Sequence, residues 1–217
     1  MLYKALYKAL YKVLCRRLAC PRLAHASLPT RQLIIRVSMS HSNTAARLLT
    51  DHLNLLRSLT IATGVLDLAC GTGRNGLVLA RQQIPVTFAD NSEAALATVS
   101  QQSTAEHLPV TCWQVNLETG EESVLAGKQF DAVLVFNYLH RQLFPEIKRV
   151  IRPGGLLFYE TFTEAQREFG RPSNANFLLR SGELEYYFND WEVLHNYEGE
   201  LTDPQRAVAQ LIARKPN

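Results

Sequence analysis

Long apolar runs are missing from this sequence. No stretch among its 217 residues contains the roughly 18 consecutive apolar residues that a membrane-spanning helix needs, so we expect no membrane span. Cysteine is scarce as well. The four cysteines form no CxxC pair and have no histidine at a zinc-binding spacing, which argues against a disulfide framework and against a metal site. We therefore expect a reducing location, the cytoplasm.

Acidic residues are absent from the first 38 positions. This segment carries eight lysines and arginines and a charge of +8, whereas the remaining 15 basic and 20 acidic residues give the rest of the chain −5. The overall charge of +3 therefore hides an acidic body. An acidic body does not favour nucleic acid, so we expect no nucleic-acid partner.

Residues 1–38 begin with a four-residue repeat, LYKALYKALYKVL, whose leucines and lysines would form a basic amphipathic helix. Three interpretations are open. The segment is a mitochondrial or other organellar targeting sequence, it lies on an anionic membrane surface, or it is no part of the working protein. The last interpretation rests on Met39, a natural start for a compact domain, and on the likeness of the repeat to a translated tandem DNA repeat. We divide the chain into this extension, residues 1–38, and a domain, residues 39–217.

The body of the chain alternates between strand and helix patterns. A leucine-rich amphipathic helix is expected over residues 45–59. Apolar runs then alternate with helical patterns, which is typical of a doubly wound, mostly parallel α/β sheet with helices on both faces. The last two strands are separated only by a short turn and predict an antiparallel hairpin at a sheet edge. The expected strands span 65–69, 85–89, 110–115, 130–136, 155–159, 191–197 and 207–213, and the expected helices 74–83, 92–102 and 144–151.

Residues 71–76, GTGRNG, match the pattern G-x-G-x-x-G between a predicted strand and a predicted helix. Glycines let the backbone turn tightly and approach a ligand closely, and the helix start offers free N–H groups. Asp90 ends the next strand, where a carboxylate can accept hydrogen bonds from both ribose hydroxyls. These features fit either NAD or S-adenosylmethionine.

Three further features favour S-adenosylmethionine. Asp67 lies four residues before Gly71, and a second carboxylate suits a cofactor with an ammonium and a sulfonium group better than one with phosphates. A Pro-Gly-Gly turn introduces the fifth strand. The closing hairpin differs from the sheet of dinucleotide-binding domains.

The segments VLDLACGTGRNGLVLA, VTFADNSEAAL, FDAVLVFNYLH and IRPGGLLFYETF, in this order, resemble the motifs of class I S-adenosylmethionine-dependent methyltransferases. The likeness covers residues 45–215, and the GxGRN loop is similar to the tellurite-resistance branch of that superfamily. It implies a Rossmann-like fold with a seven-stranded sheet. The sequence departs from the usual D-x-G-x-G-x-G at Ala69, which takes a positive φ less readily than glycine.

The resemblance assigns cofactor contacts to residues near the strand ends. Asp90 is expected to bind the ribose, against the alternative of a helix-capping role. Asp67 is expected to anchor the methionine end directly or through water, unless it is a capping carboxylate. Asn116 is expected to contact adenine or to form a turn. The predicted cofactor-binding set is Asp67, Ala69, Gly71, Gly73, Arg74, Asn75, Asp90, Asn91, Asn116, Leu117 and Phe136.

The acceptor site is expected beyond the fourth and fifth strands. His140 is a candidate general base near neutral pH, or a helix-start histidine bonded to backbone. Tyr138 is the second predicted catalytic residue. The acceptor site is also expected to lie near Arg141, Tyr159 and Glu160.

Taken together, the residues and the resemblance predict a methyltransferase that uses S-adenosylmethionine on a small-molecule acceptor. A methyltransferase acting on protein or RNA, a catalytically idle cofactor-binding module and a dehydrogenase are the alternatives. The sequence does not indicate an oligomeric state.

Overall fold

The computed structural model describes residues 44–119 and 124–217. The extension predicted over residues 1–38 lies outside the described residues, so its interpretations and the proposed boundary stay predictions. Across the described ranges, no helix combines the length and the apolar character that crossing a membrane requires.

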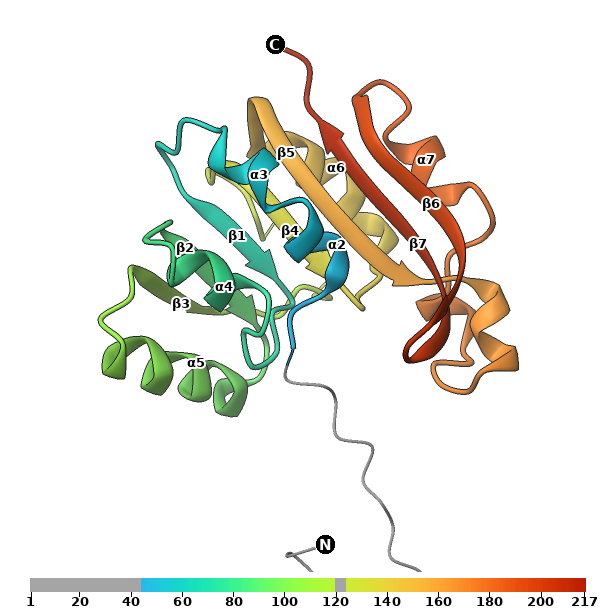
Figure 1. The fold of residues 1–217 in the computed structure, drawn as a ribbon, viewed down its shortest axis with the longest axis horizontal. Coiled ribbons are helices and arrows are strands. Elements are labelled where there is room, and N and C mark those ends of the chain that lie inside the picture. Colours follow the sequence, from blue (N-terminus) through green and yellow to red (C-terminus); the bar gives the residue numbers. More distant parts are fainter. Residues whose placement is uncertain (1–43, 120–123) are drawn as a thin grey trace, which may run out of the picture. The chain divides into compact units, whose positions relative to one another are not determined.

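A seven-stranded sheet forms the centre of the domain (Figure 1). Its order is β3-β2-β1-β4-β5-β7-β6. The first five strands are parallel, and β7 runs antiparallel to both β5 and β6. The predicted doubly wound sheet and its closing hairpin are therefore confirmed. The strands span β1 (Val65–Leu68), β2 (Val86–Asp90), β3 (Val110–Gln114), β4 (Phe130–Phe136), β5 (Ile151–Phe162), β6 (Glu192–Thr202) and β7 (Gln205–Arg214).

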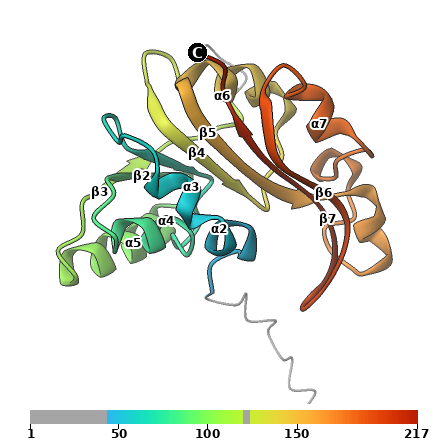
Figure 2. The same cartoon turned by 45° about the horizontal axis from the view of Figure 1, so that its top comes forward.

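Helices cover both faces of the sheet, as the two apolar clusters show. One cluster joins the sheet to α2, α3, α4 and α5, and the other joins it to α6 and α7. Figures 1 and 2 show α2 and α3 on one side of the sheet and α6 on the other. The helices are α2 (Arg47–Asp51), α3 (Leu53–Arg57), α4 (Gly76–Ala80), α5 (Glu93–Ala105), α6 (Phe144–Val150) and α7 (Glu183–Tyr187), with 3-10 turns η1 (Arg141–Leu143), η2 (Glu164–Glu168) and η3 (Ala175–Phe177).

Burial explains the apolar strands at the centre. Every residue of β1 and of β4 is buried, because both faces are covered by helices. Residues that alternate along β4 therefore belong to opposite clusters, Val133 to one and Leu134 to the other. Ser92 caps the start of α5, since its side chain accepts a hydrogen bond from the N–H of Ala95 at 3.2 Å.

The prediction of a single helix over residues 45–59 is wrong in one respect. It is interrupted at His52, which adopts φ −118° and ψ 20°, outside the helical region. The imidazole Nδ1 of His52 lies 3.0 Å from the carbonyl oxygen of Leu48, and this local hydrogen bond accompanies the break. The interruption turns His52 toward the hairpin strands, where its ring meets that of His195.

Candidate active site

The carboxyl ends of β1, β2 and β4 meet where the strand order reverses. β1 pairs with β2 on one side and with β4 on the other, so successive crossovers leave in opposite directions between β1 and β4. Ligands of open α/β sheets bind at such switch points. The glycine loop after β1 lies at this position.

The glycine loop has a left-handed backbone at three positions: Ala69 with φ +53°, Gly71 with φ +54° and Gly73 with φ +77°. A Cβ added to Gly71 would meet no atom within 4 Å, so this residue faces open space. Ala69 adopts a left-handed conformation that glycine would take more readily, at a cost of about 1–2 kcal/mol for an L-residue. The alanine noted in the sequence therefore places strain in the glycine loop.

Asp90 ties the end of β2 to this loop. Its Oδ2 accepts a hydrogen bond from the N–H of Gly71 at 2.7 Å, and its Oδ1 accepts one from the N–H of Ser92 at 2.8 Å. Each carboxylate oxygen keeps a further lone pair. The side chain is thus fixed by backbone groups and still able to accept hydrogen bonds from a ligand.

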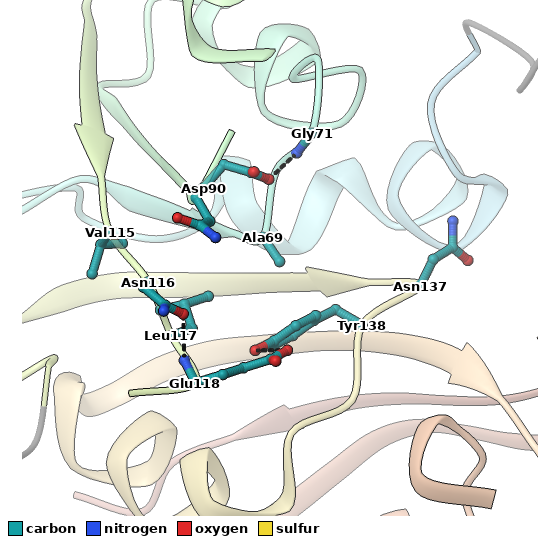
Figure 3. Close-up of a pocket in the computed structure, with 10 residues that line it drawn as sticks. Ala69, Gly71, Asp90, Val115, Asn116, Leu117, Glu118, Asn137 and Tyr138 are labelled. Carbon is teal, nitrogen blue, oxygen red and sulfur yellow. Dashed lines mark hydrogen bonds between the residues drawn. The ribbon is translucent and has the colours of Figure 1, made fainter. Parts of the chain in front are cut away.

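A cavity of about 340 Å³ opens beside Asp90 (Figure 3). This volume lies within the roughly 300–1,000 Å³ of small-molecule sites. It is lined by Tyr138, a predicted catalytic residue, and by six of the predicted cofactor-binding residues: Ala69, Gly71, Asp90, Asn91, Asn116 and Leu117. The remaining lining residues are Val115, Glu118 and Asn137. We call this space the first cavity.

The side of the first cavity away from the glycine loop combines a turn with an aromatic ring. Asn116 Oδ1 accepts a hydrogen bond from the N–H of Glu118 at 3.0 Å, so Asn116 forms a turn whether or not it also contacts adenine. Tyr138 donates its hydroxyl to Oε1 of Glu118 at 3.4 Å, as Figure 3 shows. Burial, with the Glu118 charge, raises the pKa of Tyr138 above its usual range. Tyr138 is therefore a neutral wall of this cavity at physiological pH.

Asp67 lies beneath the glycine loop and does not line the first cavity. Its side chain is 1% exposed, and Oδ2 accepts a hydrogen bond from the N–H of Gly76 at 2.9 Å. Burial raises the pKa of Asp67 to about 7, although the Gly76 hydrogen bond and the charge of Arg74 oppose this shift. A Cβ at Gly76 would lie 2.8 Å from Oδ2, so this glycine is needed for the close approach.

The other predicted cofactor residues lie outside the first cavity. Asn75 is buried and accepts a hydrogen bond from the N–H of Ala46 through Oδ1 at 2.9 Å, which fixes the start of α2. Arg74 donates to the carbonyl oxygen of Thr44 at 3.0 Å. Phe136 is buried in the apolar cluster, and a Cβ at Gly73 would clash with Val99. Roles for these residues toward the cofactor stay predictions.

His140 is not brought to the first cavity. It precedes η1 and lines a smaller cavity of about 50 Å³, which shares the residue Leu117 with the first cavity. Two contacts hold the guanidinium of Arg141: it pairs with Glu183 at 2.5 Å and donates a hydrogen bond to the carbonyl oxygen of Leu178 at 2.9 Å. These contacts join Arg141 to the segment before α7 and to the first residue of that helix.

A second cavity, of about 680 Å³, lies between α2, the start of α4 and the hairpin of β6 and β7. Arg74, His52, His195, Arg206 and Gln210 are among its lining residues. Behind them, the fully buried Glu160 accepts hydrogen bonds from Arg206 at 3.1 Å and from Gln210 at 2.7 Å. Burial is the largest cause that lowers the pKa of Arg74.

Of the residues at the second cavity named above, the sequence analysis singled out only Glu160 and Arg74. The others depend on the pairing of Gln210 with Glu160 across β5 and β7, and on a register shift in β6 between Val193 and His195. Hairpin periodicity alone does not give that shift.

Comparison with known proteins agrees with this geometry. Residues 65–155, which hold the glycine loop and Asp90, match the family described as "Methyltransferase domain". Over these residues the chain resembles the class I S-adenosylmethionine-dependent methyltransferases. The resemblance noted in the sequence is therefore confirmed. This methyltransferase domain is similar to the tellurite-resistance branch represented by TehB.

Individual relatives of the methyltransferase domain share part of their length with it. It is 30% identical over 169 residues to hemagglutinin 1 of Eikenella corrodens, covering 70% of this chain and 54% of that protein. It is 30% identical over 171 residues to the probable S-adenosyl-L-methionine-dependent methyltransferase TehB of Haemophilus influenzae, covering 70% and 57%. The chain therefore spans little more than half the length of these relatives.

The crystal structure of TehB from Haemophilus influenzae is similar in fold. Its TM-score is 0.59 at 24% identity, with 76% of this chain and 62% of that chain covered. This likeness supports the fold of the methyltransferase domain.

The cofactor of this superfamily, S-adenosylmethionine, is the one predicted from the sequence. The described residues fit it. Gly71 leaves space where a side chain would otherwise project, Asp90 presents a fixed carboxylate, and Val115 and Leu117 add apolar lining. An uncharged nucleoside with two hydroxyls suits one carboxylate and an apolar wall, whereas phosphates would meet the charge of Asp90.

Proposed function

We propose that this chain is a methyltransferase that transfers the methyl group of S-adenosylmethionine to a small-molecule acceptor. The observation that carries the proposal is that one loop borders both cavities: Gly71 lines the first and Arg74 the second. A nucleoside in the first cavity and an acceptor in the second would thus face the same glycine loop. When bound, the cofactor supplies an activated methyl group on a sulfonium.

Residues of the chain have three tasks in this proposal. Asp90 and the Gly71 backbone hold the ribose, and Ala69, Asn91, Asn116 and Leu117 surround the nucleoside. The hydrogen bond between Asn75 and Ala46 joins the glycine loop to α2 and so fixes the positions of the two cavities relative to each other. Alignment of acceptor and methyl group, with water excluded, supplies most of the rate enhancement.

The second cavity supports a small acceptor with negative character. It holds the guanidinium groups of Arg74 and Arg206, and Nε of Arg206 is buried without a hydrogen-bond partner among the described residues. A buried unpaired donor costs about 1–3 kcal/mol, which a ligand oxygen would recover. For the chain's location we propose a reducing compartment, since Cys70 and Cys112 are free thiols.

A screen with labelled S-adenosylmethionine tests the proposal. The full chain is incubated with small phenols, thiols, amines and oxyanions, and separately with total RNA and unfolded protein. We expect label in a small molecule, and less of it with Asp90→Ala. Label only in RNA or protein would contradict the small-molecule acceptor. Binding of cofactor without transfer to any substrate would favour the idle module.

A further inference from the structure

Two histidines from distant segments meet in the second cavity. His52 separates α2 from α3, and His195 follows the register shift in β6. Their ring centroids lie 4.9 Å apart with planes inclined by 54°. Both rings are partly exposed and both line the cavity, so a ligand there can reach them.

The tautomer of His195 follows from its neighbours. The amide nitrogen of Gln210 donates to Oε2 of Glu160 at 2.7 Å, and Glu160 is also paired with Arg206. A paired carboxylate accepts hydrogen bonds, so the Gln210 amide cannot be turned around without losing this bond. Its oxygen therefore faces Nε2 of His195 at 3.2 Å, and Nε2 must carry the hydrogen. The lone pair of neutral His195 is consequently on Nδ1.

His52 is fixed in the complementary way. Its Nδ1 lies 3.0 Å from the carbonyl oxygen of Leu48, which can only accept, so Nδ1 carries the hydrogen. The basic nitrogen of His52 is then Nε2. Each ring in the pair is held through one nitrogen and keeps the other as a proton acceptor.

We propose that His195 is the general base of the methyl transfer and that the acceptor carries a weakly acidic hydroxyl group, with Gln210 and Glu160 as positioning residues that keep Nδ1 free. The inference rests on the proposed function. It replaces His140 as the base, because His140 does not line the second cavity.

The step balances as follows. The acceptor hydroxyl gives its proton to Nδ1 of His195, and its oxygen lone pair forms the new bond to the methyl carbon. The C–S bond breaks, and its electron pair stays on sulfur as a neutral thioether. The imidazolium that forms keeps its Nε2–H on the amide oxygen of Gln210, which Glu160 holds in place through the Gln210 nitrogen. The proton then leaves to His52 or to solvent.

Several charged groups face His195 across the second cavity. Those that line the cavity from α2, the glycine loop and the hairpin, with Glu160 behind, are Arg47, Asp51, His52, Arg74, Asp203, Arg206 and Glu160. Arg47 and Asp203 approach each other at 3.9 Å.

Nitrogen NMR and kinetics on the full chain test the inference. Spectra of ¹⁵N-histidine-labelled protein should show His195 as the Nε2–H tautomer, and Gln210→Met should mix the tautomers. With a series of phenols of rising pKa, His195→Asn should slow methyl transfer by about 10²–10⁴-fold, most for the least acidic phenol. Gln210→Met should slow it less and shift the pH profile. Transfer to a thiolate, which needs no base, should be nearly unchanged in both variants.

His107→Asn, at an exposed position outside both cavities, is the matched control and should behave as the wild type. An Nδ1–H tautomer at His195, or equal phenol turnover in His195→Asn and wild type, would overturn the assignment of the base. Turnover of thiols but of no phenol by the wild type would overturn the acceptor class. Failure of the proposed function looks different, because wild-type protein would then bind no S-adenosylmethionine or would methylate no small molecule, neither phenol nor thiol.

Discussion

The carboxylate of Asp90 accepts a hydrogen bond from the backbone N–H of Gly71 at 2.7 Å. This bond joins the end of β2 to the glycine loop after β1, nineteen positions earlier in the sequence. It places a charged acceptor beside a backbone position that leaves open space. The first cavity is therefore shaped by the same residue that is expected to bind the ribose.

Replacing Asp90 by Ala should weaken S-adenosylmethionine binding by roughly 1.5–3 kcal/mol, because charge-assisted hydrogen bonds to ribose are lost. The structure adds a second effect. Two backbone N–H groups lose their acceptor, so the free energy of unfolding should also fall, by about 1 kcal/mol. Calorimetric titration and urea denaturation measure the two effects. Asp90→Asn keeps one acceptor oxygen and should lie between; normal binding by Asp90→Ala would remove the ribose role.

Asp67 should make stability fall as the pH rises. Its folded pKa of about 7 exceeds the usual 3.8, so the folded protein binds more protons than the unfolded chain between these values. The stabilising effect of protonation is complete below about pH 4 and is lost as the pH rises through 7. Asp67→Asn removes this titration and should gain stability relative to the wild type over that window, up to roughly 4 kcal/mol at about 1.4 kcal/mol per pKa unit.

Urea denaturation at pH 4, 5.5 and 7 measures the difference between Asp67→Asn and the wild type. The exposed Glu93→Gln is the control and should show no such trend. If the free energies of unfolding of Asp67→Asn and the wild type differ by the same amount at all three pH values, burial does not raise the pKa of Asp67.

Ala69→Gly should stabilise the folded protein by roughly 0.5–1 kcal/mol. The change relieves the left-handed strain at φ +53°, and the greater freedom of glycine in the unfolded chain offsets part of the gain. Thermal and urea denaturation give the value. Ala97→Gly, at an exposed position inside α5, is the matched control and should destabilise by about 1 kcal/mol. Equal losses in both variants would mean that Ala69 carries no strain.

Deleting residues 1–38 should leave the melting temperature, cofactor affinity and methyl transfer nearly unchanged. Residues 1–38 precede the leucine-rich segment that begins the domain, and none of the motifs expected to bind the cofactor lies in them. The truncated and full chains are compared by calorimetry and by transfer of labelled methyl groups. A clear loss of stability on truncation would show that the extension packs on the domain, and both the targeting and the spurious-start interpretations would weaken.

Much of the fold follows from local patterns in the sequence. The buried runs of β1 and β4 are apolar throughout because both faces of the sheet are covered, and the short turn before β7 indicates a hairpin. The position of Asp90 was predictable because carboxyl ends of parallel strands share one edge. Features that depend on the dihedral angles of a single residue were not predictable. The break at His52 sits within an unbroken leucine pattern.

The acceptor side was harder to predict, because it depends on tertiary pairing. Glu160 meets Gln210 only through the register of β5 with β7, and His195 joins them only because β6 shifts register by a bulge. Nor does the sequence tell whether the carboxylate of Asp67 faces a ligand or the backbone of Gly76, since both lie beside the same loop.

Titration calorimetry of the full chain with S-adenosylmethionine, its demethylated product and NADH tests the central claim most directly. The account predicts saturable binding of the sulfonium cofactor and of its product, weakened in Asp90→Ala, and no binding of NADH. Tighter binding of NADH than of S-adenosylmethionine would contradict it.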